Sequence, residues 1–502
     1  MSAASSPQTA PRRRRIGVDA GHEHYKWWAL SCTSLGMLLA TINSGTLVIA
    51  LPDLEKALGV DLLTLVWVIL AFMIASTVLV LTFGRLSDIF GRKKAFVLGF
   101  AVFTAASLGA GFAHGGTDLI LWRIVQGIGG ALLFANASAL VTDAFPKEQL
   151  GVAMGTNVMV AGIGLVLGPV LGGALVEISW HWVFWFNVPL GIAGTLWAWT
   201  VLEELVRPEA DHRFDWWGTL TFVIGLTGLT YGISRGGIVA WDDTSTIVSL
   251  IAAAVLLPAF VLIERRTPSP MLDLSLFNDR GFSAATGAAF LNGLSRFSLT
   301  FVFVLYFQGA LGDDPILAGV KLAPLALGML ISSPLAGAYA DRHGARILAA
   351  VGMVVVAVSL AGMTTLGTGS SYVLAAFWLL LNGLGSGMFN SPNTAAMMGS
   401  VPVHRRGIAG GTRMMLQNTG SVLSIAFVLG IITAAVPTKV LLSIFSGVSS
   451  GLSDAALEPF IHNMHSALWV LCGTAVLGAG VSLLRPATSR AAVEPATEAS
   501  AA

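Results

Sequence analysis

The sequence predicts an all-α membrane protein, and three observations support this prediction. The chain of 502 residues is 55% apolar and only 11% charged, with a mean hydropathy of +0.78, whereas about a quarter of the residues of a soluble domain are charged. Apolar runs recur along the whole chain, and their length of about 20 residues is what crosses a bilayer. One charged stretch of the first half also returns in the second half.

We expect fourteen membrane spans, separated by the short segments that hold most of the charge. Each span is an apolar run bounded by charged, proline or glycine residues. The expected spans are 27–49, 65–83, 95–113, 118–142, 150–176, 182–202, 214–234, 244–263, 282–308, 315–338, 345–366, 372–396, 407–434 and 463–484.

The distribution of Lys and Arg predicts the orientation in a cell membrane, because positive charge is retained in cytoplasmic loops. With both termini in the cytoplasm, 21 of the 28 Lys and Arg residues fall in cytoplasmic segments and four within spans. The three expected outside are Lys56, Arg235 and Lys439. The basic run 12–15 is interpreted as part of this bias rather than as a nucleic-acid site. Asp19 and Glu23 precede the first apolar run, which argues against a removable signal peptide.

An internal repeat divides the chain into two matched halves. The stretch GAYADRHGAR, 337–346, echoes GRLSDIFGRK, 84–93, with an offset of 253 positions. Parallel six-span repeats of this kind build many transporters. The expected divisions are a basic cytoplasmic tail 1–26, a six-helix bundle 27–202, two inserted helices 203–263, a cytoplasmic connector 264–281, a second six-helix bundle 282–485 and a disordered tail 486–502.

The stretch FGRLSDIFGRKKA, 83–95, resembles the loop between spans two and three of the major facilitator superfamily. The resemblance implies loops that latch one conformation of a rocking protein, with glycines permitting close turns. The alternative, that the basic residues only anchor the loop in the cytoplasm, leaves the aspartate and the glycine spacing unexplained. The expected gating residues are Gly84, Asp88, Gly91, Arg92, Lys93, Gly337, Asp341, Gly344 and Arg346.

Three further motifs extend the resemblance over nearly the whole chain. WRIVQGIGGALL is similar to the fourth-span motif, with Arg123 and Gln126 inside the membrane. SWHWVFWFNVPLG resembles a signature of the fourteen-spanner drug/proton antiporters, with His181 where arginine is usual. These motifs imply the major facilitator fold, with two helices inserted between the bundles. GLVLGPVLGG resembles the fifth-span antiporter motif, through Gly164, Gly168, Pro169, Gly172 and Gly173.

One position departs from the family pattern. The first span of that family carries an aspartate where INSGTLVIALP, 42–52, has Asn43. An amide does not exchange a proton at physiological pH, so the family's coupling acid cannot be transferred to this chain. Asp53, Asp313 and Asp314, near the outer ends of spans, are alternative candidates for loading protons.

Polar residues within the spans predict a wet, electropositive cavity. The ionisable residues there are basic, Arg123, Arg296, Lys321 and Arg413, and no acid falls near the middle of a span. An ion at mid-membrane costs roughly 3 kcal/mol, which favours a functional role. Lys321 has snorkelling to the outer interface as an alternative. The expected cavity residues are Asn43, Arg123, Gln126, Arg296, Lys321, Asn382, Ser386, Asn390, Arg413 and Gln417.

Helical spacing supports this assignment in two late spans. Asn382, Ser386, Asn390 and Asn393 share one face of the twelfth span, because they are four, four and three residues apart. Hydrogen bonding between helices is the alternative interpretation of such a face. A basic cavity of this kind predicts a preference for neutral or anionic amphipathic compounds over lipophilic cations.

The predicted function is secondary active export of small amphipathic molecules, drugs or antibiotics, by alternating access coupled to proton influx. The sequence has no nucleotide-binding phosphate loop. A dedicated exporter of one metabolite or lipid fits the same motifs, and a lipid-modifying enzyme or a non-transporting sensor fits them less well. We expect no enzymatic activity, no cofactor, no nucleic acid and a monomer. We also expect no metal, although Glu458, His462 and His465 approach ligand spacing.

Overall fold

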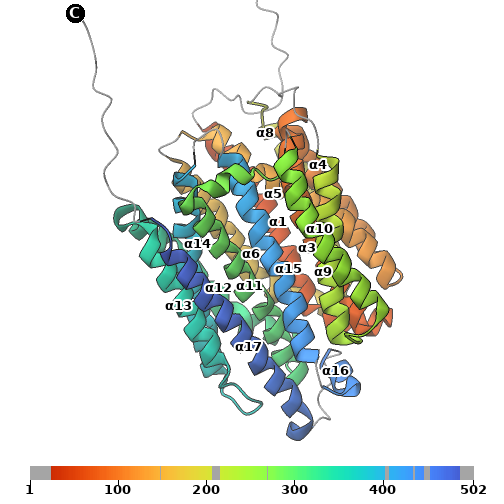
Figure 1. Cartoon of the computed structure of the whole chain (residues 1–502). Coiled ribbons are helices and arrows are strands. Elements are labelled where there is room, and N and C mark those ends of the chain that lie inside the picture. The colour runs from red at the N-terminus through yellow and green to blue at the C-terminus, as the bar shows by residue number, and fades with distance from the viewer. Residues whose placement is uncertain are drawn as a thin grey trace, which may run out of the picture.

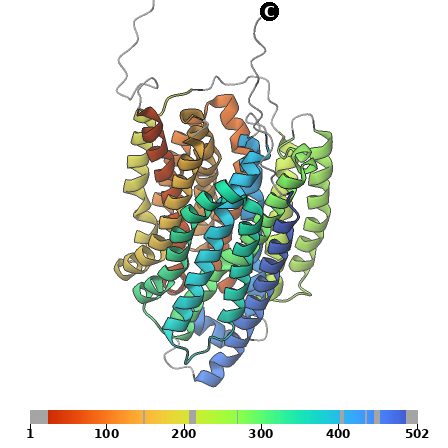
Figure 2. The ribbon, with the colours of Figure 1, turned by 90° about the vertical axis from the view of Figure 1, so that its left-hand side faces the viewer.

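The computed structural model describes residues 24–146, 149–205, 215–267, 270–401, 406–433, 436–445 and 453–486. Long helices run side by side, and each runs opposite to the one before it (Figure 1). The first described helix begins, and the last one ends, at the same end of the bundle, which is called here the terminal face (Figure 2). The opposite end is called the far face.

The first half holds six long helices and two short ones. The short helix α2 follows α1 at the far face, and α7 leads directly into α8. The bounds are α1 Tyr25–Ile49, α2 Leu51–Leu58, α3 Leu62–Phe90, α4 Arg92–Ala110, α5 Gly116–Ala144, α6 Leu150–Ile178, α7 Trp182–Trp185 and α8 Asn187–Val201.

The second half repeats this arrangement after an inserted hairpin, α9 and α10. A short connector helix η2 precedes α11, and a π-helical segment η3 ends it at the far face. The bounds are α9 Trp216–Ile238, α10 Thr244–Arg266, η2 Leu274–Asn278, α11 Arg280–Val304, η3 Leu305–Ala310, α12 Pro315–His343, α13 Ala345–Met363, α14 Tyr372–Gly399, α15 Arg406–Thr433, α16 Thr438–Phe445 and α17 Asp454–Leu483.

Side chains fix where several helices begin. A carboxylate or hydroxyl before the first turn accepts a hydrogen bond from a backbone N–H that has no partner within the helix. This cap sets the start of helices in both halves and in the inserted hairpin. The capping residues are Asp61, Asp215, Asp243, Asp279, Asp314 and Ser371.

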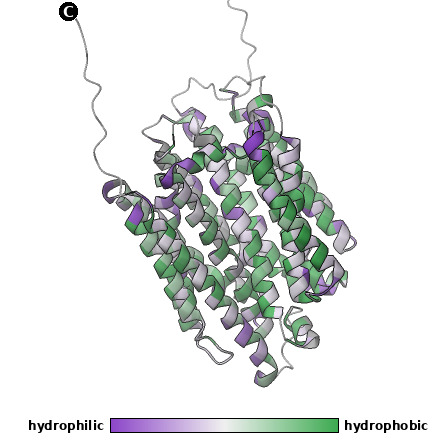
Figure 3. Cartoon of the chain, in the orientation of Figure 1, coloured by the Kyte–Doolittle hydropathy of each residue, from purple (hydrophilic) through white to green (hydrophobic). Residues whose placement is uncertain are grey.

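Twelve helices of the described ranges are long and apolar enough to cross a membrane. Figure 3 shows their apolar residues along the helix shafts and polar residues gathered toward the ends. Two of the fourteen expected spans are not among the twelve. α8 has only 15 residues, and α9 is rich in glycine and threonine. The number of fourteen therefore stays a prediction.

The inserted helix α9 packs against both halves of the protein. Near the terminal face, the Thr219 hydroxyl lies 3.2 Å from that of Thr82 on α3. Near the far face, Thr433 of α15 donates a hydrogen bond to the carbonyl oxygen of Gly237, at 2.8 Å. The hairpin α9–α10, at the right of Figure 1, therefore joins the two bundles rather than standing apart from them.

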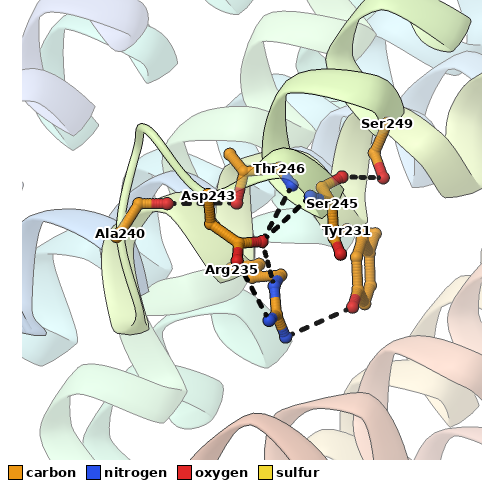
Figure 4. A network of polar contacts seen from close by, with 7 residues as sticks. All are labelled: Tyr231, Arg235, Ala240, Asp243, Ser245, Thr246 and Ser249. Carbon is orange, nitrogen blue, oxygen red and sulfur yellow. Dashed lines mark hydrogen bonds and ion pairs between the residues drawn. The ribbon is translucent and has the colours of Figure 1, made fainter.

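A polar network holds the turn between α9 and α10 (Figure 4). The Arg235 guanidinium donates from Nε to Asp243 Oδ2 at 2.8 Å and from Nη1 to the Tyr231 hydroxyl at 3.4 Å. Asp243 also accepts from the backbone N–H groups of Ser245 and Thr246, at 3.0 and 3.3 Å. One carboxylate therefore both caps α10 and ties it to α9.

Candidate transport site

A cavity inside the bundle lies at the boundary of the two halves. α6 of the first half contributes Pro169, and α11, α12 and α14 of the second half contribute the remaining wall. The empty space is ≈ 380 Å³, including the part that is open to solvent. Apolar side chains such as Met329 form most of the wall, while Arg296, Thr300 and Ser386 supply polar groups. The wall thus combines apolar and polar groups, as the walls of ligand sites commonly do.

Among the described residues, Arg296 is the one ionisable residue that lines this cavity. Its Nη1 lies 3.9 Å from the sulfur of Met329, a weak acceptor. Its Nε is buried without a hydrogen-bond partner among the described residues. A cation in the middle of a membrane protein is costly unless a countercharge accompanies it. An anionic or hydrogen-bond-accepting group entering the cavity would lower that cost.

A row of hydrogen bonds leads from the cavity wall to a second cation. Asn390 Nδ2 donates to the carbonyl oxygen of Ser386 at 3.0 Å, and Gln417 Nε2 donates to Asn390 Oδ1 at 3.3 Å. Arg413 Nη1 donates to Gln417 Oε1 at 2.8 Å. The structure thus brings together these four sequence-predicted residues across α14 and α15.

Two asparagines of the same predicted face lie in other environments. Asn382 Nδ2 donates to the Ser359 hydroxyl on α13 at 2.8 Å. Asn393 Nδ2 donates to the carbonyl oxygen of Ala285 on α11 at 3.1 Å. Both are fully buried, and both hydrogen bonds join one helix to another. Asn382, which was expected in the cavity, does not line it.

Lys321 and the acidic candidates gather at the far face, away from the cavity lining. Lys321 Nζ lies 2.5 Å from Asp313 Oδ2 and forms an ion pair with it. Asp314 accepts a backbone hydrogen bond in the first turn of α12 and caps that helix. Burial raises the pKa of the Asp53 carboxyl, and nearby Lys56 acts in the opposite direction. Burial of Asp53 therefore favours its protonated form.

The first half holds a separate buried network around Asn43. Asn43 Oδ1 accepts hydrogen bonds from Gln126 Nε2 at 3.1 Å and from Asn187 Nδ2 at 3.2 Å. Gln126 Nε2 also donates to the Ser107 hydroxyl at 2.7 Å. The network joins α1, α4, α5 and α8. Sequence reasoning did not identify Ser107, because a lone serine in an apolar helix belongs to no motif.

Arg123 completes this network as its only ionisable member. Its Nη1 donates to Gln126 Oε1, and its Nε donates to the carbonyl oxygen of Val68 at 2.9 Å. The guanidinium also lies 4.5 Å from the centre of the Phe72 ring, a cation–π contact. Arg123 is 1% exposed, and its partners are all neutral. Gln126 thus bridges Arg123 to Asn43, the position where the family pattern has an acid.

The glycines of the antiporter motif allow α6 to approach two helices closely. Toward α1, a methyl group built on Gly168 would lie 2.9 Å from the Cα of Gly45, and one on Gly172 would lie 2.8 Å from the Cα of Thr46. Gly164 faces α1 as well. Distances this short mean that even alanine would force the helices apart.

The same motif closes the far ends of the two halves against each other. A methyl group on Gly173 of α6 would lie 2.5 Å from the Pro315 carbonyl oxygen of α12, and one on Gly319 of α12 would lie 2.5 Å from that of Pro169. Gln308 also donates to the carbonyl oxygen of Ile49, at 3.4 Å. The far ends of the halves are therefore in backbone contact. Gly319 lies in no motif, and sequence reasoning did not single it out.

The two repeated loops have the same backbone geometry at the terminal face. Gly91 between α3 and α4 has φ +105°, and Gly344 between α12 and α13 has φ +87°. A side chain is rarely accommodated in this region. Gly84 faces α5 and Gly337 faces α14, the corresponding helices of the two halves. The two loops thus share a backbone conformation and equivalent neighbouring helices.

Hydrogen bonds and an ion pair secure the first loop. The Glu204 carboxylate accepts from the backbone N–H groups of Arg92 and Lys93, at 2.8 and 3.2 Å, at the start of α4. Arg92 Nη1 lies 2.7 Å from Asp143 at the end of α5. Arg346 lies in the first turn of α13. The side chains of Asp88 and Asp341 lie outside the described residues.

Replacing Gly91 by alanine is expected to destabilise the protein more than most single substitutions do. The backbone conformation costs a non-glycine residue about 1–3 kcal/mol. The new methyl group would also lie 2.5 Å from a Glu204 oxygen and displace that carboxylate from α4. Thermal unfolding in detergent should show a lower midpoint than for Gly59→Ala, since Gly59 has φ +60° but no neighbour within 4 Å in the part of the chain that the structure describes. Equal midpoints would show that the Glu204 contact contributes nothing.

Comparison with known proteins supports one family. The profile of the Major Facilitator Superfamily matches residues 33–425. The chain is 30% identical over 410 residues to the "Tetracenomycin C resistance and export protein" of Streptomyces glaucescens, covering 82% of this chain and 76% of that protein. It is 31% identical over 409 residues to the "Multidrug resistance protein Stp" of Mycobacterium tuberculosis, covering 81% and 75%.

A solved structure agrees with this assignment at the level of the fold. The crystal structure of a bacterial homolog of the human lysosomal transporter Spinster, in an inward-facing and unoccupied conformation, superimposes with a TM-score of 0.65. It covers 93% of this chain and 98% of that one at 16% identity. With two matched helical halves, repeated loops and a cavity at their boundary, this chain is a membrane transporter that belongs to the major facilitator superfamily.

Proposed function

We propose that the chain is a secondary active exporter of small amphipathic molecules, including drugs or antibiotics, that works by alternating access. Two relatives that match most of its length are named for resistance or export. The cavity lies where the two halves meet, which is where transporters built from repeats hold their substrates. Rocking of the halves about this position would expose the cavity to one side of the membrane at a time.

We place the terminal face in the cytoplasm and count fourteen spans. The bias of Lys and Arg supports this orientation. α9 has 23 residues, which is long enough to cross a bilayer, and it packs against both halves. α7 and α8 together cover 182–201 with one interruption, which brings that segment close to the length of a span. The far-face contacts between α6 and α12 then belong to a state closed to the outside.

The proposed substrate preference is inferred mainly from the positive charge of Arg296. The cavity wall offers a guanidinium whose Nε has no partner among the described residues, and an anionic group is the strongest ligand for it. Arg413 adds positive charge at the end of the row from Ser386. Neutral or anionic amphipathic compounds are therefore favoured, and lipophilic cations are repelled.

Proton influx is the proposed energy source. The chain has no phosphate loop for ATP, and one proton moved across 100 mV supplies about 2.3 kcal/mol. Asn43 cannot carry this proton. Asp53 at the far face is the candidate that fits best, since burial raises the pKa of its carboxyl and so favours uptake of a proton from the outside.

Replacing Arg296 by glutamine is expected to remove the preference for anions. In proteoliposomes with an imposed pH difference, transport of an anionic amphipathic dye should fall about tenfold, the effect of losing about 1.4 kcal/mol of charge-assisted hydrogen bonding. Transport of a neutral analogue should change less than threefold, because the apolar wall remains. Initial rates over a range of dye concentrations would measure both effects.

Arg296→Lys is the matched control, because it keeps the charge and loses the planar fork. It should retain more anion transport than the glutamine variant. The assignment of Arg296 to the substrate site would be wrong if both dyes lost transport equally in the glutamine variant. Strong transport of quaternary ammonium compounds by the unmodified protein, with none of the anionic or neutral dyes, would contradict the proposed substrate class.

A further inference from the structure

Two carboxyl groups meet at the terminal end of the inserted hairpin. Asp215 precedes α9, and its Oδ1 accepts from the backbone N–H of Gly218 at 2.8 Å. Glu264 lies two residues before the end of α10 and is 2% exposed. Its Oε2 accepts from the backbone N–H of Leu272 in the connector, at 2.9 Å. One oxygen of each carboxyl group is thus accounted for.

The other two oxygens border the same small space, and no donor among the described residues reaches either of them. Asp215 Oδ2 and Glu264 Oε1 are buried and have no hydrogen-bond partner among the described residues. A methyl group on Gly218 would lie 2.3 Å from the first and 2.7 Å from the second, so both border the same small space. The two groups are within hydrogen-bonding reach of each other. Two ionised carboxylates have no hydrogen to share, whereas a single proton between them satisfies both oxygens.

The charges that act on Glu264 from the described residues fit one proton rather than none or two. Arg85 of α3 acts on Glu264 with the opposite charge, and Asp215 acts with the same charge. A pair that holds one proton carries one negative charge rather than two. Two ionised groups would leave an excess negative charge in a buried position, where like charges repel most strongly.

The pair occupies the junction of the hairpin, α3 and the connector. Thr82 of α3 lies against Thr219 of α9, and its hydroxyl also donates to the sulfur of Met271 in the connector, at 3.2 Å. Arg85 follows Gly84 of the repeated loop directly. A change of charge at Asp215 and Glu264 would therefore act at the start of that loop.

We propose that Asp215 and Glu264 together bind one proton, and that this proton-binding site fastens the terminal end of α9–α10 to α3 and the connector. Loss of the proton places two negative charges side by side. Their repulsion moves Glu264 away from Asp215 and breaks its hydrogen bond to Leu272. The site lies outside the transport cavity, and the proposal does not depend on which compound is transported.

Infrared spectroscopy of the purified full-length protein in nanodiscs tests the shared proton. The unmodified protein should show the carbonyl band of a protonated carboxyl group at neutral pH, and this band should disappear as the pH is raised. Asp215→Asn and Glu264→Gln should each remove the band, because an amide donor replaces the shared proton. Asp242→Asn, at an exposed position of the opposite turn, should leave the band unchanged.

Any of three other outcomes would overturn the proposal that Asp215 and Glu264 share a proton. Absence of the band in the unmodified protein at neutral pH would show that both groups are ionised. A band that survives in both variants belongs to a different residue. A band removed by Glu264→Gln but kept in Asp215→Asn would show a protonated glutamic acid that shares nothing.

Hydrogen exchange of connector residues 270–278 tests the fastening. After correction for intrinsic pH dependence, exchange should accelerate at least tenfold across the pH range in which the band disappears. The double variant with both amides should show no such step, because it cannot lose the proton. Equal profiles for the two proteins would overturn the fastening even if the proton is shared.

Discussion

Gly319→Val is expected to abolish transport while leaving a folded protein. The first carbon of the new side chain would lie 2.5 Å from the Pro169 carbonyl oxygen and 3.0 Å from the Val170 nitrogen. These are backbone atoms of α6, which cannot rotate away as a side chain can. Overpacking of this kind costs about 3 kcal/mol at the upper end of its usual range. The conformation that is closed at the far face, called here the far-closed state, would be destabilised by that free energy. The reason is that the contact between α6 and α12 exists only in that conformation.

A loss of about 3 kcal/mol shifts the balance between two conformations by roughly 150-fold. Transport into proteoliposomes should then fall at least tenfold, because each cycle needs the far-closed state. Thiol labelling would report the shift directly. A cysteine introduced at Thr300 in the cavity wall, with Cys32 and Cys472 replaced, should react faster with a membrane-impermeant reagent added from the far side.

Gly162→Val is the matched control on α6, because no atom of the described residues lies within 4 Å of a methyl group at that position. Both substitutions place a β-branched residue in a helix, and only one meets another backbone. If Gly319→Val transported at the rate of the control, the contact between α6 and α12 would have no role in the cycle. Gly173→Val should behave like Gly319→Val, since it meets the Pro315 carbonyl at the same distance.

The sequence predicts most spans and the repeat because each depends on local pattern. A bilayer demands long apolar runs, and the twelve candidate spans are such runs. Gly91 and Gly344 were predictable as a pair, because no other residue tolerates their backbone conformation. Glu204, which caps α4 from 111 or more residues away, has no sequence signal. A capping partner from a distant segment of the chain depends on packing that no local pattern encodes.

The polar face of α14 shows where helical periodicity stops being informative. Spacing places Asn382, Ser386, Asn390 and Asn393 on one face, as expected. The neighbouring helices cross α14, so one face meets α13 at Asn382, the cavity at Ser386 and α11 at Asn393. Periodicity fixes a direction from the helix axis, and the crossing of neighbours decides what lies in that direction.

The sequence places Glu264 at the start of the charged connector 264–281. The segment that begins with it, ERRTP, reads as a cytoplasmic loop because of its charge and proline. In the structure α10 continues to Arg266, so Glu264 is inside the helix and buried. An error of a few residues at a helix end therefore concealed a buried acid.

Asn43→Asp is expected to stabilise the first half and to give transport a new dependence on pH. Asn43 Oδ1 already accepts from Gln126 and Asn187, and a carboxylate oxygen would accept the same hydrogen bonds. Asn43 Nδ2 is a buried donor without a partner among the described residues, and such a group costs about 1–3 kcal/mol. The aspartate would remove that donor and supply the negative charge that the neutral partners of Arg123 lack.

Thermal unfolding over a pH series would measure the effect, with a gain of about 2 kcal/mol expected near neutral pH. The gain should vanish as the pH falls, because the ionised carboxylate is the form that pairs with Arg123. Asn136→Asp is the matched control. Asn136 is equally buried on α5, but it donates to a carbonyl oxygen and has no cation in its hydrogen bonds. If both variants were destabilised equally, the positive charge of Arg123 would not stabilise a carboxylate at position 43 through Gln126. Asn43 would then serve only in packing. Stabilisation of Asn43→Asp alone would show that this chain keeps the cationic half of a charge pair whose acid is missing.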